Sequence, residues 1–354
     1  MIAAWLIAAR TVVACLRRIL SARNVAHALA RRGAVAGTEA KRMQVFTDHR
    51  DLPPIGGAAV TIGNFDGLHQ GHRALVDAVG AAARDRGLRR AVLTFEPHPA
   101  ELLAPGRAPV RIAPPEEKLR LLAAAGIDLV VAQRFEPDFA GLSPQAFIEQ
   151  VLVDGLRARH VVVGYDFGFG RRRAGDVNTL RAAGQVHGFT VQAIEAQRLP
   201  DGSVASSTAV RSAVQAGDLS QARTILGRWY SLTGTVVTGD QRGRGLGFPT
   251  ANVESDWALR PALGVYGGWL EVDGVPARAV INVGRKPTFG DYPATIEAHV
   301  LGAEGLSLYG RSVRVWFATR LRAEQRFANL DALVAQIAAD AAEAGRRLAL
   351  LDPP

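Results

Sequence analysis

Cysteine is almost absent from this chain, since Cys15 is the only one among 354 residues. A single cysteine cannot form an intramolecular disulfide or a multi-cysteine zinc site, so we expect a reducing compartment, the cytoplasm. Long apolar runs are missing as well. Arg10, Arg17 and Arg18 interrupt the one candidate, whereas a membrane-spanning helix needs about 20 consecutive apolar residues. We therefore expect no membrane partner.

A surplus of one charge sign is absent from most of the chain. The net charge is +9, but residues 1–42 carry eight basic residues against Glu39 alone, and the other 312 residues carry 34 basic and 32 acidic ones. A nucleic-acid-binding domain normally has its basic patch on the folded body, so we expect no nucleic-acid partner. The length predicts two domains, and the 48% of hydrophobic residues excludes global disorder.

Residues 1–42 alternate short apolar runs with arginines. This pattern is similar to an organellar transit peptide, and a secretory signal or an amphipathic membrane anchor are the alternatives. Met43, however, opens a segment that is typical of a natural start, with a strand, a polar turn and another strand. We therefore interpret residues 1–42 as a non-native or disordered extension produced by an over-extended gene prediction.

Strand-like and helix-like stretches alternate between residues 43 and 200. Apolar β-rich runs predict strands at 59–62, 91–95, 129–132, 160–163 and 190–194. Apolar residues at three- and four-residue spacing predict helices at 71–86, 116–125, 144–152 and 177–187. Such alternation predicts a parallel sheet with helices on both faces.

The pattern changes after Trp229. Short alternating segments at 232–237, 267–272, 279–283, 295–300 and 313–318, separated by Gly/Pro-rich turns, predict a small antiparallel barrel. Two helices at 207–216 and 219–226 precede it, and an alanine-rich helix at 329–350 closes the chain. The domains are therefore predicted as an extension (1–42), an α/β domain (43–227) and a barrel domain (228–354).

Residues 61–72 read TIGNFDGLHQGH and indicate a phosphate site. A strand ends, a glycine-rich turn follows, and His69 and His72 lie where a helix begins. Gly67 and Gly71 allow close approach of the backbone, and the free N–H groups of a helix N-terminus bind anions. Two imidazoles there can stabilise negative charge on a phosphate attacked in line, without a covalent intermediate. Surface histidines in a turn are the alternative, which the preceding strand and GNFDG disfavour.

Two further segments have residues suited to the same site. Ser206, Ser207 and Thr208 precede a helix and can cap it, or bind phosphate there. The loop GYDFGFGRRRAGD at 164–176 contains Asp166 and Phe167 before three arginines, and is either a solvated basic loop or a cover over a ligand.

The second half contains its own glycine-rich stretch, GDQRGRGLG, followed directly by PTAN. The hydroxyl of Thr250 and the amide of Asn252, on a rigid turn, can help to coordinate Mg²⁺ and orient a phosphate. Glu297 lies within the predicted strand at 295–300, where an outward carboxylate without a role is the alternative.

These motifs together resemble bifunctional riboflavin kinase/FMN adenylyltransferases. The similarity runs in order through GNFDGLHQGH, TFEPHP, EKLRLLAAAGID, GYDFGFGRRRAGD and SSTAVR, and then through PTAN, GVY, NVGRKPTF, IEAH and LRAEQRF. It implies a Rossmann-like nucleotidyltransferase domain followed by a β-barrel kinase domain with a C-terminal helix. It also implies ATP-dependent phosphorylation of riboflavin to FMN, then adenylylation of FMN to FAD with release of pyrophosphate, with ATP as co-substrate and Mg²⁺ in both steps.

The resemblance also implies roles for single residues. Glu297 is expected to be the general base of the kinase, and His69 and His72 the catalytic pair of the adenylyltransferase. Residues expected to bind ATP or phosphate are Gly63, Asn64, Gly67, Gly71, Ser206, Ser207, Thr208, Arg211, Gly243, Gly245, Gly247 and Asn252. Flavin contacts are expected from Phe65, Asp66, His98, Asp166 and Phe167, and metal contacts from Thr250 and Asn252.

Two positions depart from the family pattern: Gly168 stands where many relatives have Arg, and Ser307 where Asp is usual. One alternative is a chain in which only one module is active. Another is a flavin-sensing regulator whose basic N-terminal arm binds nucleic acid. The expected partners are riboflavin, FMN, FAD and ATP, and a homo-oligomer stays open.

Overall fold

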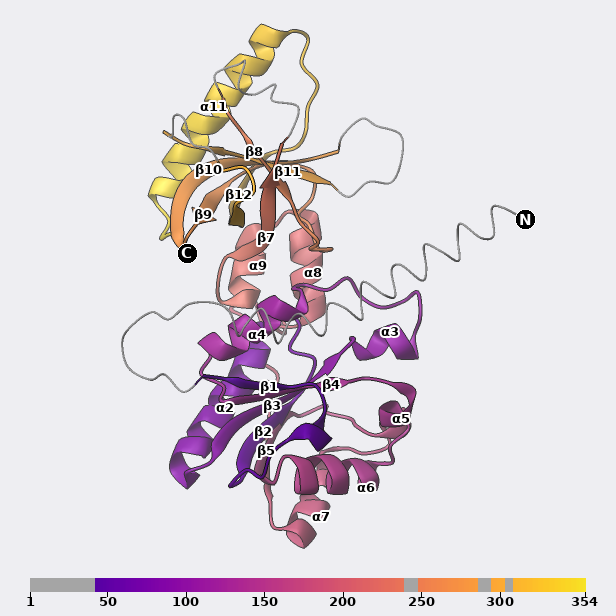
Figure 1. Ribbon diagram of the computed structural model, residues 1–354. Helices are drawn as coiled ribbons and strands as arrows, with labels where there is room; N and C mark the ends of the chain where they lie inside the picture. The colour runs from indigo at the N-terminus through magenta and orange to yellow at the C-terminus, as the bar shows by residue number, and fades with distance from the viewer. Residues whose placement is uncertain (1–41, 239–247, 286–293, 303–307) are drawn as a thin grey trace, which may run out of the picture.

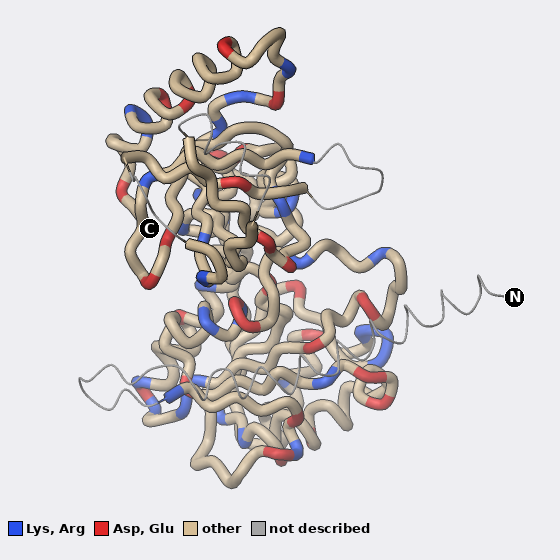
Figure 2. The backbone as a smooth tube through the Cα atoms, turned by 45° about the horizontal axis from the view of Figure 1, so that its top comes forward, with Lys and Arg blue, Asp and Glu red and all other residues tan. Residues whose placement is uncertain are grey.

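A computed structural model describes residues 42–238, 248–285, 294–302 and 308–354, and shows an α/β part joined to a β-barrel (Figure 1). Helices α8 (Ser207–Ala216) and α9 (Leu219–Leu226) lie between the two parts. Lys and Arg residues are interspersed with Asp and Glu residues along both parts (Figure 2). Within the described ranges, no helix is both long enough and apolar enough to cross a membrane.

The α/β part contains a six-stranded sheet in the order β1-β4-β3-β2-β5-β6. All neighbouring strands are parallel, as predicted from the strand–helix alternation. The strands are β1 (Gln44–Phe46), β2 (Ala58–Ile62), β3 (Arg89–Glu96), β4 (Leu129–Arg134), β5 (Ala158–Gly164) and β6 (Thr190–Ile194).

Helices cover both faces of this sheet because alternate residues of each strand are apolar on both sides. Ala59 on β2 packs on one face against α2 (Gln70–Arg86), and α4 (Pro115–Ala124) covers the same face further along. Val60, the next residue, packs on the other face with α7 (Val177–His187) and the helical segment after α6 (Pro144–Ala146). Two short helices, α3 (Pro99–Leu103) and α5 (Pro137–Ala140), follow β3 and β4.

Two predictions about local structure are wrong in detail. The helix expected at 144–152 is a single α-turn that continues as a π-helix over Phe147–Gly155. The PTAN segment, expected to be a rigid turn, enters strand β8 (Ala251–Glu254) at its third residue, because β7 and β11 provide hydrogen-bonding partners on both sides. Tertiary pairing overrides the local turn preference at this point.

The barrel is closed, with the strand order β10-β11-β8-β7-β12-β9 and β9 paired back to β10. Its strands are β7 (Tyr230–Val237), β8, β9 (Gly264–Val272), β10 (Val275–Gly284), β11 (Thr295–Val300) and β12 (Ser312–Arg322). Helix α11 (Leu330–Ala349) covers its outside, where Ala344 and Leu348 pack on Trp269.

The hydrophobic interior of the barrel continues into α8 and α9. Val214 and Ile225 of these helices belong to the same buried cluster as Leu232 and Phe317 of the barrel. The predicted boundary between residues 227 and 228 falls between α9 and β7, inside this cluster. The two parts are therefore joined by apolar packing as well as by the chain.

Candidate active sites

The first candidate site lies where the sheet changes its winding direction. From β2 the chain continues to β3 and β4 on one side and returns to β5 on the other side of β2. In open parallel sheets, ligands bind at the carboxyl ends of the strands at such a point. The GNFDG loop follows β2, His98 follows β3, and Asp166 follows β5.

The loop between β2 and α2 has an unusual backbone. Phe65, Gly67 and Leu68 have φ values of 48°, 77° and 41°, in the left-handed region of the backbone that residues other than glycine rarely adopt. A Cβ at Gly67 would lie 2.6 Å from Cγ2 of Ile112, so only glycine fits. Strain of this kind persists only where surrounding groups hold the backbone, and it concentrates at functional sites.

The two predicted histidines lie together at the start of α2. His69 is the N-cap residue, and its Nδ1 accepts the backbone N–H of His72 at 3.4 Å. Their rings stack with centroids 3.7 Å apart, and Phe65 packs 5.1 Å from His72. Nδ1 of His72 is buried and has no hydrogen-bond partner within the described part of the chain. Such an orphaned polar atom is typical of a site that is completed by a ligand.

Both imidazoles are neutral at physiological pH. Burial lowers the pKa of His69 to about 4, and the positive charges of Arg228 and Arg211 act in the same direction. Burial also lowers the pKa of His72 far below its usual range, with smaller effects from His69 and Lys118. Since Nδ1 of His69 accepts a hydrogen bond, its proton lies on Nε2. The site therefore offers a bound anion a neutral hydrogen-bond donor, and not the positive charge of an imidazolium.

The N-termini of α2 and α8 converge on this loop. Ser206 caps α8 as predicted, with Oγ accepting the N–H of Ala209 at 3.2 Å. Ser207 Oγ donates to the carbonyl of Asp66, and Thr208 is exposed in the first turn. A Cβ on Gly71 would lie 3.0 Å from the carbonyl of Ala205, so the close approach of the two helices favours glycine there. Two helix N-termini pointing to one place favour bound phosphate.

Asp66 and Arg211 bond to each other. Asp66 Oδ2 accepts Nη2 of Arg211 at 2.6 Å, and the same carboxylate accepts the N–H groups of Ile112 and Ala113. Arg211 also donates Nε to the carbonyl of Val110. The sequence predicted a flavin contact and a phosphate contact for these two residues. In the structure they tie the GNFDG loop to the segment before α4 and to α8.

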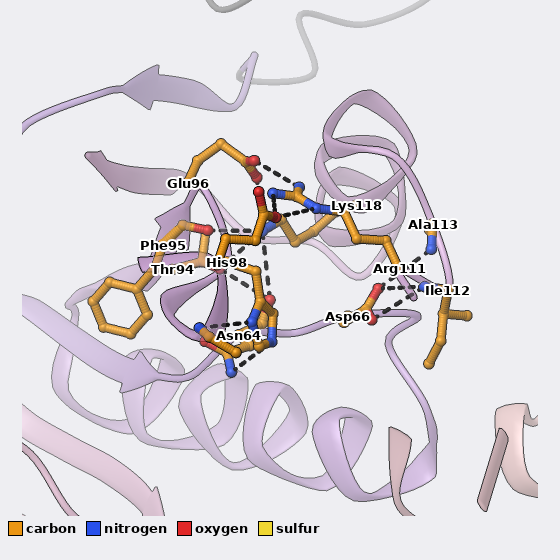
Figure 3. A network of polar contacts seen from close by, with 12 residues as sticks. Asn64, Asp66, Thr94, Phe95, Glu96, His98, Arg111, Ile112, Ala113 and Lys118 are labelled. Carbon is orange, nitrogen blue, oxygen red and sulfur yellow. Dashed lines mark hydrogen bonds and ion pairs between the residues drawn. The ribbon is translucent and has the colours of Figure 1, made fainter. Parts of the chain in front are cut away.

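A buried lysine connects the ends of β2 and β3 (Figure 3). Nζ of Lys118 lies 3.3–3.5 Å from the carbonyls of Asn64 and Phe95, the hydroxyl of Thr94 and the carboxylate of Glu96. The side-chain amide of Asn64 lies 3.2 Å from Nε2 of His98. Sequence reasoning assigned no role to Lys118. The sequence does contain one indication of such a role, since Lys118 is a single lysine among the leucines of the helix predicted at 116–125.

Arginine completes this network at its outer edge. Arg111 pairs with Glu96 and with Glu101, each at 2.6 Å. The carboxylates thus balance the charges of Lys118 and Arg111, which keeps the ends of both strands in place.

Aromatic rings gather beside the same strand ends, and sequence reasoning missed most of them. Ring contacts of 5.2–6.2 Å link a set that spreads over 75 positions with no local pattern: Phe95, Phe135, Phe139, Phe147, Phe167 and Phe169. Phe167 stacks on Phe169 and is partly exposed, and the exposed Asp166 precedes it. Phe147 and Phe169 are buried in the core, and the other four rings are partly exposed, so they offer apolar area to a planar ring.

The second candidate site lies on the outer face of the barrel. Asn252 of β8, Glu297 of β11 and Asn282 of β10 occupy one register row across three adjacent strands. Their neighbours Ile296 and Ala298 belong to the barrel core, so the row points outward. The prediction that Glu297 lies within a strand is confirmed.

The segment before β8 is attached to this face. Nδ1 of His299 donates to the carbonyl of Pro249 at 2.9 Å, which places Thr250 between that contact and Asn252. A Cβ on Gly284 would lie 2.7 Å from Oε1 of Glu324, a second carboxylate at this site that sequence reasoning missed. The predicted phosphate residues Gly243, Gly245 and Gly247 lie outside the described residues, as does the departure at Ser307.

The donors on this face fit magnesium. The hydroxyl of Thr250 and the amide oxygen of Asn252 are hard oxygen ligands of the kind that Mg²⁺ prefers. In the part of the chain that the structure describes, no group of three or more His, Cys, Asp or Glu residues forms a dedicated metal cage.

Comparison with known proteins accounts for both parts. The family model for FAD synthetase matches residues 54–209, and the one for riboflavin kinase matches residues 226–348. A bifunctional riboflavin kinase/FMN adenylyltransferase of Escherichia coli (strain K12) is 43% identical over 304 residues, which is 85% of this chain and 96% of that protein. The Pseudomonas fluorescens protein of the same name is 41% identical and covers 84% of this chain and 94% of its own length.

A solved structure has the same two-part fold. The crystal structure of a protein named macrolide-efflux protein from Streptococcus pneumoniae is 29% identical, with a TM-score of 0.76 over 84% of this chain and 97% of that one. Efflux has no counterpart in the two family matches, and the regulator alternative finds no support among the relatives. This chain belongs to the bifunctional riboflavin kinase/FMN adenylyltransferases, the transferases that phosphorylate riboflavin to FMN and adenylylate FMN to FAD.

Proposed function

We propose that adenylylation takes place where the N-termini of α2 and α8 converge beside His69 and His72. The observation that carries this assignment is the pair of stacked, neutral imidazoles at a helix start that faces a second helix start. An oxygen of the FMN phosphate attacks the α-phosphorus of ATP, the bond from that phosphorus to the bridging oxygen breaks, and pyrophosphate leaves. Neutral N–H donors stabilise the charge that develops on the α-phosphate oxygens.

The remaining residues of this site divide into ATP and flavin contacts. Gly63, Asn64, Gly67 and Gly71 supply backbone close to the nucleotide, and Ser206, Ser207, Thr208 and Arg211 receive the leaving pyrophosphate. The flavin ring lies on the aromatic surface near Phe167, with His98 and Asp166 beside it. Phe65 and Asp66 are both buried in the loop after β2 and hold that loop in place for these contacts.

Phosphorylation takes place on the outer row of the barrel. Glu297 accepts the proton of the 5′-hydroxyl of riboflavin as that oxygen attacks the γ-phosphate of ATP. Thr250 and Asn252 would hold Mg²⁺, which would neutralise phosphate charge. Gly243, Gly245 and Gly247, which lie outside the described residues, are assigned to the phosphates from their sequence motif. The partition into domains 43–227 and 228–354 assigns one site to each.

The setting proposed for the enzyme is the cytoplasm, without nucleic acid or membrane as a partner. The single cysteine and the nearly neutral body of the chain support it. A homo-oligomer is compatible with the same setting.

Incubation of the purified chain with riboflavin, ATP and Mg²⁺, followed by chromatography of the flavins, tests the proposal. We expect FMN to appear first and FAD after it. FMN without FAD would show that only the barrel is active. No product from riboflavin, together with FAD from supplied FMN, would show that only the α/β site is active.

A further inference from the structure

One arginine from the barrel side reaches into the adenylyltransferase loop. Arg228 lies between α9 and β7, one residue beyond the predicted domain boundary. Its Nη2 donates to the carbonyl of Gly67 at 2.7 Å, and its Nη1 to the carbonyl of Leu68 at 3.2 Å. The two carbonyls are thus held by one planar guanidinium, a geometry in which two bonds fix direction as well as distance.

The segment that Arg228 holds is the strained part of the loop, directly before His69. Gly67 and Leu68 have positive φ, and the next residue, His69, is the N-cap of α2. The other contacts to this loop come from different directions: Ser207 Oγ bonds the Asp66 carbonyl, and Arg211 bonds the Asp66 carboxylate. Arg228 contacts Gly67 and Leu68, the two residues between Asp66 and His69.

The barrel side of this contact is itself fixed to the α/β part. Arg314 of β12 pairs with Glu117 of α4 at 2.8 Å, and both side chains are about nine-tenths buried. Arg314 also donates to Oγ of Ser231, three residues after Arg228. Burial lowers the pKa of Arg228 to about 10, and the carboxylate of Glu117 opposes that shift, so Arg228 is a cation at neutral pH. The guanidinium of Arg228 therefore lies where the Arg314–Glu117 ion pair holds the barrel to the α/β part.

We propose that Arg228 is a positioning residue for adenylylation, which sets the place of His69 through the carbonyls of Gly67 and Leu68. The kinase side of the chain would then help to build the other active site. This inference rests on the role proposed above for His69. Arg228 does not contact the reacting atoms itself, so its effect reaches the reaction only through the loop.

Three substitutions separate this role from mere packing. Arg228→Met keeps the length of the side chain but removes the charge and the donors. Arg228→Lys keeps the charge and loses the planar fork. Arg223→Met is the matched control, because Arg223 is another guanidinium of the same junction and lies 3.7 Å over the ring of Trp229. FAD formation from supplied FMN and the initial rate of riboflavin phosphorylation are measured for each variant.

We expect Arg228→Met to lower kcat for adenylylation about tenfold or more, since a misplacement of about 1 Å can cost on the order of 10²-fold. KM for ATP and FMN and the rate of phosphorylation should stay within about twofold, because the loss is confined to positioning in the transition state. Arg228→Lys should be intermediate, and Arg223→Met should leave both reactions within about twofold.

An NMR titration of the His69 imidazole separates loss of the positive charge from loss of the planar fork, because Arg228→Lys removes only the fork: a lower rate of adenylylation in Arg228→Lys at an unchanged His69 pKa is due to the fork. Burial is the main cause of its low pKa, and the positive charges facing the ring are Arg228 and Arg211, with His72 stacked on it. The pKa of His69 should rise in Arg228→Met and not in Arg228→Lys.

The proposal is overturned if Arg228→Met keeps adenylylation within twofold of wild type. It is also overturned if both reactions fall together with the melting temperature, because the residue would then be structural only. His69→Ala separates this failure from that of the proposed function: full adenylylation in His69→Ala contradicts the role of the histidine itself.

Discussion

The two active sites are built in different ways. Around His69 and His72 the side chains come from loops and helix starts, and most of them bond to one another: Asp66 to Arg211, Lys118 to Glu96, Asn64 to His98. On the barrel, Asn252, Glu297 and Asn282 form one register row across three adjacent strands and point outward. The first site depends on a network of partners, whereas the second depends on the alignment of three strands. Substitutions should therefore spread their effects in the first site and stay local in the second.

The largest effect is expected for Glu297→Gln, which keeps the shape of the side chain and removes the base. Riboflavin phosphorylation should fall about 10²–10⁴-fold, the usual contribution of a general base. Adenylylation of supplied FMN should be unchanged, because the residue belongs to a strand of the barrel. Product analysis with each substrate supplied separately measures both. Loss of adenylylation in folded protein would mean that the barrel site is not local.

His72→Ala should lower adenylylation by about 10²–10³-fold while FMN still accumulates from riboflavin. The imidazole is a preorganised donor, and removal of one such donor costs about that much in other enzymes. Quantification of FMN and FAD over time from riboflavin and ATP checks this. FAD at the wild-type rate would remove His72 from the site.

Lys118→Met tests the network more finely. Adenylylation should fall about tenfold, because Asn64 and Phe95 lose their shared donor. Stability should change by no more than about 1 kcal/mol, since burying the ammonium is itself costly and Glu96 keeps Arg111 as its partner. Steady-state kinetics and urea unfolding measure the two effects. A large loss of stability with normal kinetics would show that Lys118 serves folding and not the site.

The last effect concerns the pH dependence of stability. Unfolded His69 binds a proton below about pH 6.5, whereas burial lowers the pKa of the folded group to about 4, so the folded state loses stability as the pH falls between these values. From pH 7.5 to pH 5 this residue should account for a loss of about 2 kcal/mol. His69→Asn, which retains a capping side chain, should lose that much less in urea titrations at the two pH values. An equal loss in both proteins would contradict the burial of a neutral imidazole.

The sequence predicts most of the fold because its signals are local. Helix α7 and strand β6 have the predicted bounds, and the histidines lie at a helix start as GNFDGLHQGH indicates. Two of the three residues in the register row of the barrel are predicted correctly. Asn282 and Glu297 fall within the strands expected at 279–283 and 295–300, whereas Asn252 is expected in a turn and lies in β8.

The contacts that hold the first site could not be predicted in this way. Arg228 and Gly67 lie 161 residues apart, and Arg314 and Glu117 lie 197 apart, so no local pattern relates them. Their pairing follows from how the barrel packs on α4 and α9. The ion pair between Arg211 and Asp66 shows the same limit, because the two residues lie 145 positions apart.

Mixing two single-site variants tests the central claim, two separate sites on one chain, most directly. Glu297→Gln and His72→Ala are each supplied with riboflavin, ATP and Mg²⁺, alone and as an equimolar mixture, and FAD is measured by chromatography. We predict that neither variant alone makes appreciable FAD and that the mixture does after a lag, because FMN made by the His72→Ala chains is adenylylated by the Glu297→Gln chains. A mixture that makes no FAD, while each folded variant lacks both reactions, would contradict the assignment of the two steps to two sites.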